Sequence, residues 1–212
     1  MGFIRDIIAR YNGPIMQINT QLIQDQIPYY LSQEAKDNLV KALEEFPKNT
    51  AYYIDLYKND ILQGDGWTSF ELINFETGDR KKVKGIVLSN SCDIDPTNKR
   101  HTRIKITFAP IIRLDRYTKL LEKSGLSNSS IDGKINAIKE QKVTTLFYLP
   151  KGNGLDNEHI AMLDDLHTIP LDAFNDIAER EKLFTLSQIG FYLFILKLSV
   201  HFCRFHENII RE

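Results

Sequence analysis

The sequence contains little cysteine, tryptophan or methionine, and neither sign of charge is in clear excess. Its 212 residues include two cysteines, one tryptophan and three methionines, and the formal net charge is −1. Two cysteines far apart exclude a disulfide-stabilised scaffold, and without an evident signal peptide we expect a reduced, cytoplasmic protein. A net charge near zero argues against a general nucleic-acid coat or a membrane-surface protein.

Long hydrophobic runs are also missing. The longest apolar stretch, residues 189–200, is interrupted by Lys197, whereas a membrane span needs about 20 apolar residues. We therefore expect a buried helix there and no association with a membrane. Because no repeat, low-complexity tract or clear linker is present, we expect one domain over residues 1–212.

The stretch from Lys84 to Leu114 has the strongest strand character in the chain. Residues 85–89 form a short β-branched run that is typical of a strand buried on both faces. Residues 103–109 alternate between polar and apolar side chains, which indicates a half-buried strand. We predict two adjacent central strands, with Pro110 ending the second one or placing it at an edge.

Hydrophobic periodicity predicts the remaining segments of an α+β protein. We expect a helical N-terminal region (1–50), a β-barrel core (51–165) with a helical insert at about 114–142, and C-terminal helices (166–212). The individual predictions are helices at 3–11, 32–46, 171–182 and from Ser187 onward, and strands at 52–57, 67–75, 143–149 and 159–163. In the final helix, we expect four side chains to be largely buried: Phe191, Phe194, Ile195 and Leu198.

Four short motifs carry a resemblance to a known family. They are Gly64-Asp65 before a strand, the basic turn of residues 78–82, the strand of residues 85–90 and the strand of residues 106–111. Together they resemble the barrel core of the MazF/PemK-like family, over roughly residues 60–114. The resemblance implies an SH3-like, partly open β-barrel braced by N-terminal and C-terminal helices, in a family that usually dimerises and often cleaves RNA.

The same resemblance implies which residues would carry ribonuclease chemistry. In the RNA-cleaving members, an arginine in the basic loop and a threonine after the second strand do so. Arg80 stands for the arginine, but the threonine position is Ile112, whose alkyl side chain has no hydroxyl. The Ser91-Cys92-Asp93-Ile94 motif also resembles a segment found in a group of uncharacterised bacterial proteins.

Cys92, Asp93 and Arg80 are the candidate catalytic residues. A cysteine becomes a nucleophile when nearby positive charge lowers the pKa of its thiol, and the basic residues that follow Cys92 are able to supply that charge. The negative charge of Asp93 disfavours the thiolate and would therefore raise the pKa of the Cys92 thiol. The alternative is that Cys92 is a small buried residue at a strand end, with Asp93 and Asp95 capping the loop.

The charges are separated along the chain. Residues 80–119 hold eleven Lys/Arg and three Asp, whereas residues 152–181 hold eight Asp/Glu and one Arg. The two halves are expected either to attract each other or to face different partners, unless both are ordinary solvated surface. Six residues of the basic half are the candidate nucleic-acid contacts: Arg80, Lys81, Lys82, Lys99, Arg100 and Arg103.

No metal site or cofactor is predicted. His201, Cys203 and His206 resemble a ligand cluster, but at about 100° per residue His201 points away from the other two. A polar stripe on the last helix is either its solvent-facing side or a positive strip for phosphate. It comprises Lys197, His201, Arg204, Asn208 and Arg211.

The function that these patterns favour is a nucleic-acid-associated or assembly module. The resemblance places it in a bacterial toxin–antitoxin or phage-defence type system, without the full set of ribonuclease residues. Its expected partners are RNA or DNA and a second copy of the chain or another protein. The alternative is an active enzyme, either a diverged endoribonuclease that uses Arg80 or a Cys92-dependent enzyme.

Overall fold

The computed structural model describes residues 51–74, 76–98 and 101–202. The helices predicted at 3–11 and 32–46 lie outside the described residues, as do Lys99, Arg100, Cys203, Arg204, His206, Asn208 and Arg211. The strands are β1 (Tyr53–Ile54), β2 (Gly66–Ile73), β3 (Arg80–Val87), β4 (Lys105–Arg113), β5 (Leu146–Leu149), β6 (His159–Met162), β7 (His167–Pro170) and β8 (Lys182–Leu186). The helices are α4 (Leu114–Lys123), α5 (Asn128–Lys139), α6 (Leu171–Asn175) and α7 (Gln188–Phe202).

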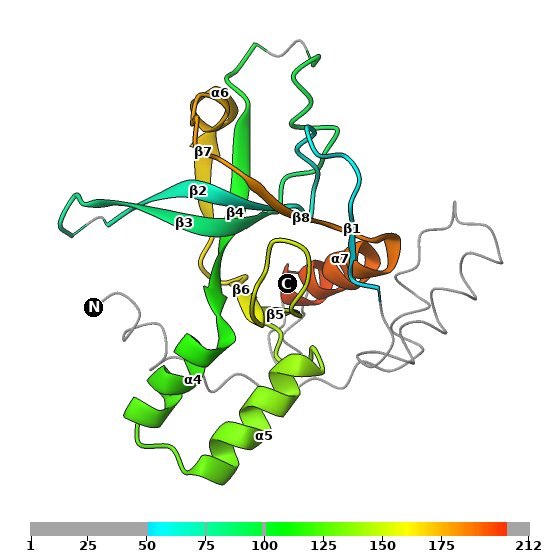
Figure 1. The fold of residues 1–212 in the computed structure, drawn as a ribbon. Coiled ribbons are helices and arrows are strands. Elements are labelled where there is room, and N and C mark those ends of the chain that lie inside the picture. The colour runs from blue at the N-terminus through cyan, green and yellow to red at the C-terminus, as the bar shows by residue number, and fades with distance from the viewer. Residues whose placement is uncertain (1–50, 75, 99–100, 203–212) are drawn as a thin grey trace, which may run out of the picture.

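The strands form one antiparallel sheet in the order β1-β8-β2-β3-β4-β6-β5, with β7 also paired to β4 (Figure 1). The predicted pair of central strands is confirmed, because β3 and β4 are neighbours in register from Lys84↔Ile111 to Val87↔Phe108. Both strands are buried where they pair: Ile86, Val87 and Phe108 are fully inaccessible to solvent.

Pro110 neither ends the ladder nor places β4 at an edge of the sheet, the two outcomes that were predicted. It lies inside β4, opposite Gly85 of β3. On its other side, β4 changes partner, since β7 pairs with residues 105–108 and β6 with residues 111–113. Pro110 falls in the gap between these two partners, where the ladder can accept a residue that has no N–H group to donate.

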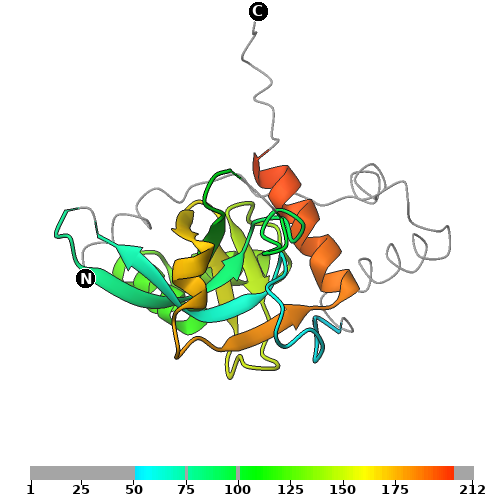
Figure 2. The same ribbon diagram turned by 90° about the horizontal axis from the view of Figure 1, so that it is seen from above.

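The sheet curls so that the two ends of the strand order approach each other (Figures 1 and 2). The hydroxyl of Tyr53, in β1, donates to the carbonyl of Pro150, which follows β5, over 2.8 Å. Asn153 donates from its side chain to the carbonyl of Ile54, and the N–H of Gly154 donates to the carbonyl of Leu183 in β8. The protein is therefore a mixed α+β structure with a half-barrel of antiparallel strands.

Helices α4 and α5 confirm the predicted helical insert, and they lie together below the sheet in Figure 1. Helix α4 has one apolar side, from which Leu114, Tyr117 and Leu121 are buried. Helix α5 begins at a capping serine, Ser127, whose hydroxyl accepts a hydrogen bond from the N–H of Ser130. The buried residues of both helices pack on the outer face of β5 and β6.

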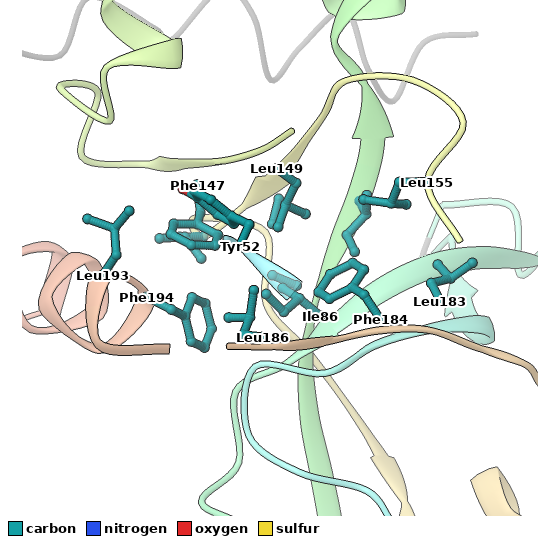
Figure 3. Packing of buried hydrophobic residues seen from close by; sticks show 14 residues of the cluster. Tyr52, Ile86, Phe147, Leu149, Leu155, Leu183, Phe184, Leu186, Leu193 and Phe194 are labelled. Carbon is teal, nitrogen blue, oxygen red and sulfur yellow. The ribbon is translucent and has the colours of Figure 1, made fainter. Parts of the chain in front are cut away.

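Helix α7 packs against the inner face of the half-barrel (Figure 3). Ser187 caps it as predicted, accepting a hydrogen bond from the N–H of Gly190. The centre of the Phe194 ring lies 5.1 Å from the centre of the Phe147 ring in β5, and Leu186 of β8 belongs to the same cluster. Of the four side chains expected to be buried in this helix, Phe194 is fully buried, whereas Phe191, Ile195 and Leu198 are half-buried.

Two predictions for the C-terminal region were wrong. The helix expected over residues 171–182 ends after five residues, and the region contains strands β7 and β8 as well as helices. Lys197 is also not on the solvent-facing side of the last helix, since only 3% of its surface is exposed. Within the described part of the chain, no helix is both long enough and apolar enough to cross a membrane.

Candidate nucleic-acid interface

The end of the β2–β3 hairpin projects from the sheet as a two-stranded arm (residues 70–83; Figure 1). Strand β8 pairs with β2 only at Gly66 and Trp67, and β4 pairs with β3 only from Lys84 onward. The arm reverses between Asn74 and Asp79, whose backbones are hydrogen-bonded, and Gly78 there adopts a φ of 73° that favours glycine. Both long edges of the arm are therefore unpaired among the described strands.

The basic residues predicted at the arm lie at the start of β3 and are exposed. Residues directly opposite each other in an antiparallel pair share a face. Arg80 opposes Ile73 and Lys82 opposes Glu71, so these two cations lie on one face of the arm. Lys81 opposes Leu72 and lies on the other face. The arm therefore presents positive charge on both faces.

The connection between β3 and β4 holds the other predicted residues in a series of turns. The Asn90 side chain accepts a hydrogen bond from the N–H of Cys92, and the buried Ile94 fixes the middle of the loop in the core. Asp95 accepts hydrogen bonds from the N–H and hydroxyl of Thr97, and these bonds lower the pKa of its carboxyl. The predicted capping role of Asp95 is thereby confirmed.

The three candidate catalytic residues do not form one site. Arg80 begins β3, whereas Cys92 and Asp93 follow its other end, and seven residue steps along a strand span roughly 23 Å. Cys92 is an exposed free thiol, not the buried residue of the alternative interpretation, and its hydrogen bonds in the described structure involve its backbone.

Asp93 and Arg103 both line a hollow of about 470 Å³ in the β3–β4 connection. The other residues that line it are Ser89, Asn90, Thr102, Ile104 and Lys105. A larger hollow of about 650 Å³ lies along β1 and β8, and none of the predicted site residues lines it. Of these two hollows, the one beside Arg103 coincides with the predicted interface.

Two of the predicted nucleic-acid contacts are paired with carboxylates of the acidic half. The Nζ atom of Lys82 lies 2.8 Å from the Oε2 atom of Glu179. Arg103 holds Asp172 through Nε at 2.9–3.0 Å and Nη2 at 2.8 Å. These hydrogen-bonded cations lower the pKa of both carboxyl groups. Of the outcomes expected for the two charged halves, attraction within the chain is observed at these two pairs.

Arg80 has a weaker partner on its own arm. Its Nη1 atom lies 3.5 Å from Glu71, and both side chains are more than a third exposed. An exposed ion pair of this kind contributes little to stability, about 0–1 kcal/mol, and leaves the guanidinium accessible. Arg80 consequently remains accessible on the arm, as does Lys81, whereas Lys82 is exposed but pairs with the acidic half.

A buried ion pair behind this surface was not predicted. Asp65 is fully buried, and its Oδ2 atom lies 2.7 Å from the ammonium group of Lys182. Lys182 also donates to the carbonyl of Tyr57 and the hydroxyl of Thr185. Burial raises the pKa of Asp65, although Lys182 opposes that shift. The only signal in the sequence was the Gly64-Asp65 motif, which does not indicate a partner.

The position that resembles the family's threonine has a structural role here. Ile112 lies in β4 opposite Ile160 of β6 and packs against the cluster beneath α4 and α5.

Among the described residues, no group of three or more His, Cys, Asp or Glu side chains is placed to hold a metal ion. No protein-family model matches this chain, and comparison with curated proteins gives no match.

Proposed function

We propose that this protein is a nucleic-acid-associated or assembly module of a bacterial toxin–antitoxin or phage-defence type system. In this proposal the half-barrel is of the SH3-like, MazF/PemK-like type, with N-terminal and C-terminal helices bracing it. Its partners are RNA or DNA, together with a second copy of the chain or another protein. The packing of Phe194 against Phe147 supports the bracing role of α7.

The projecting arm is the observation that carries the nucleic-acid proposal. Arg80, Lys81 and Lys82 are exposed on a two-stranded ribbon, and a ribbon of this width fits the major groove of a duplex. Lysine and arginine that contact phosphates release counterions, which favours binding to any sequence. The arm therefore has both the shape and the charge that phosphate contacts need.

A binding role is favoured over an enzyme site that combines Arg80 with Cys92 or with a hydroxyl group at position 112. Arg80 lies at one end of β3 and Cys92 beyond the other, and Ile112 offers no hydroxyl. The alternative is a diverged endoribonuclease or a Cys92-dependent enzyme, and RNA cleavage would identify it.

The test measures binding of fluorescently labelled single-stranded RNA and duplex DNA over a series of salt concentrations. We expect salt-sensitive binding by the wild type, and weaker binding with a shallower salt slope for Arg80→Ala/Lys81→Ala. On a single strand the slope should fall by about 0.7 for each phosphate that the variant no longer neutralises. The matched control is Lys119→Ala/Lys123→Ala, which removes the same charge from exposed positions of α4.

Electrophoresis of the labelled RNA after incubation separates binding from cleavage. Intact RNA is the expected result. Cleavage that disappears in Cys92→Ala or in Arg80→Ala would replace the binding proposal with the enzyme alternative. Equal weakening by the arm variant and the α4 control would show that binding is not located on the arm.

A further inference from the structure

The acidic partners of Lys82 and Arg103 come from one short segment. Glu179 and Asp172 both belong to residues 171–181, which comprise α6 and the connection to β8 and are called here the acidic segment. Lys82 lies on the arm, whereas Arg103 lies at the end of the β3–β4 connection. The acidic segment therefore bridges the two parts of the basic surface.

Aromatic contacts fix the acidic segment in place. The ring of Phe174, which is fully buried, stacks on Phe70 at 4.5 Å between ring centres. Arg180 lies over the rings of Trp67 and Phe174 at 5.8 and 5.3 Å, and it donates a hydrogen bond to the carbonyl of Phe174.

Backbone contacts and a buried ion pair add to this attachment. The N–H of Thr68 donates to the carbonyl of Glu181, and the N–H of Glu181 donates to the Thr68 hydroxyl. Lys182, which forms the buried ion pair with Asp65, directly follows the acidic segment in the chain. The carboxylates of Asp172 and Glu179 thus project from a backbone that these other contacts hold in place.

The geometry at Arg103 resembles the recognition of a phosphate. A guanidinium group forms two parallel hydrogen bonds with a carboxylate or with a phosphate through the same donors. Arg103 donates from Nε to both carboxylate oxygens of Asp172, and its Nη2 atom lies 2.8 Å from Oδ2, so these two nitrogen atoms face the carboxylate together. A phosphate group that used these donors of Arg103 or Lys82 would compete with a carboxylate that is already bound.

We propose that the acidic segment is a built-in competitor of nucleic acid, whose Asp172 and Glu179 occupy two phosphate contacts of the basic surface. This inference rests on the proposed function. All four side chains are more than half exposed, so each pair is weak and is screened by salt. The competitor consequently raises the nucleic-acid concentration needed for binding, and does not block binding outright.

The experiment compares Asp172→Asn/Glu179→Gln with wild type, using labelled single-stranded RNA over a series of salt concentrations. We expect the variant to bind about threefold to tenfold more tightly at low salt, with a salt slope steeper by about 0.7 for each cation set free. Asparagine at position 172 retains an oxygen that can accept the hydrogen bond from the N–H of Ala173.

The matched control is Glu122→Gln/Asp156→Asn, which changes the net charge equally at exposed positions outside the acidic segment. Adding Lys82→Ala/Arg103→Ala to the acidic-segment variant should remove the gain in affinity. An equal gain in the control would overturn the inference, because it would be an effect of net charge alone. If neither wild type nor any variant binds RNA or DNA at low salt, the proposed function itself fails.

Discussion

Lys197 has no carboxylate among its described hydrogen-bond partners, although it lies in the interior. Its ammonium group donates to the carbonyls of Gln141 and Val143. His201 lies one turn further along α7. Burial lowers the pKa of His201, and the negative charge of Asp164 opposes that shift. Burial lowers the pKa of Lys197 to about 7. Carbonyl partners therefore compensate only in part for the loss of hydration.

This burial predicts a specific pH dependence of stability. Lysine in the unfolded chain has a pKa of about 10.4, so between about pH 7 and pH 10 the unfolded state binds a proton that the folded state lacks. Stability should consequently rise with pH in this window, by up to about 1.4 kcal/mol per pH unit, and should not change below it from this cause.

The variant Lys197→Met tests this dependence. Its free energy of unfolding in urea, measured from about pH 7 to about pH 9, should lack the rise that we expect for wild type. At pH 7 the variant should be at least as stable as wild type, because methionine is buried without loss of hydration of a charge. Parallel curves for the two proteins would show that Lys197 keeps an ordinary pKa in the folded state.

The pairing of β8 with β2 depends on a contact that hydrophobic patterns do not reveal. Asp65 precedes β2 and Lys182 begins β8, and their ion pair is almost completely removed from solvent. Removing one partner leaves an unpaired buried charge, which costs about 3–5 kcal/mol. Asp65→Leu and Lys182→Met should each destabilise the protein by this amount.

The double variant Asp65→Leu/Lys182→Met should recover much of the loss, because it leaves no isolated charge. Urea unfolding of the four proteins gives the coupling energy between the two residues. If the two single effects simply add, the pair does not hold β8 to β2.

Local patterns predicted strands where the order of polar and apolar residues follows from which faces are buried. The β-branched run at 85–89 and the alternation at 103–109 indicated β3 and β4, because both patterns follow directly from which faces are buried. The helix predicted at 171–182 failed because its end depends on distant contacts. Arg180 donates to the carbonyl of Phe174, and β8 then pairs with β1 and β2.

The candidate interface was predicted in composition and not in arrangement. The basic and acidic halves were visible in the sequence, but their pairing joins residues 97 and 69 positions apart. The predicted strand at residues 85–89 lies between Arg80 and Cys92, but the sequence does not show that the strand begins at Arg80 and so places the two residues beyond its opposite ends. Register and curvature decide such distances, and both arise from the packed sheet.

Closure of the half-barrel depends on how tightly the loop after β5 approaches β8. The N–H of Gly154 donates to the carbonyl of Leu183 over 2.8 Å. A Cβ atom at position 154 would lie 2.7 Å from that carbonyl oxygen and 2.9 Å from the Leu183 Cα. Because these are backbone atoms of a paired strand, the neighbour cannot move aside without disturbing β8.

Two glycine-to-alanine variants should consequently change stability in opposite directions. Gly154→Ala should destabilise the protein by about 1–3 kcal/mol, as expected for overpacking. Gly133→Ala, in the exposed interior of α5 with no atom within 4 Å of the added Cβ, should stabilise it by about 0.5–1 kcal/mol through helix propensity. Urea unfolding measures both, and hydrogen exchange locates the first effect.

If Gly154 closes the half-barrel, amide exchange in Gly154→Ala should accelerate in β1 and β8, which meet the loop, and not in α4 or α5. Gly133→Ala should leave β1 and β8 unchanged. Uniform acceleration over the described strands would mean that the half-barrel opens as one unit, and that this contact is not the point at which its two ends are joined.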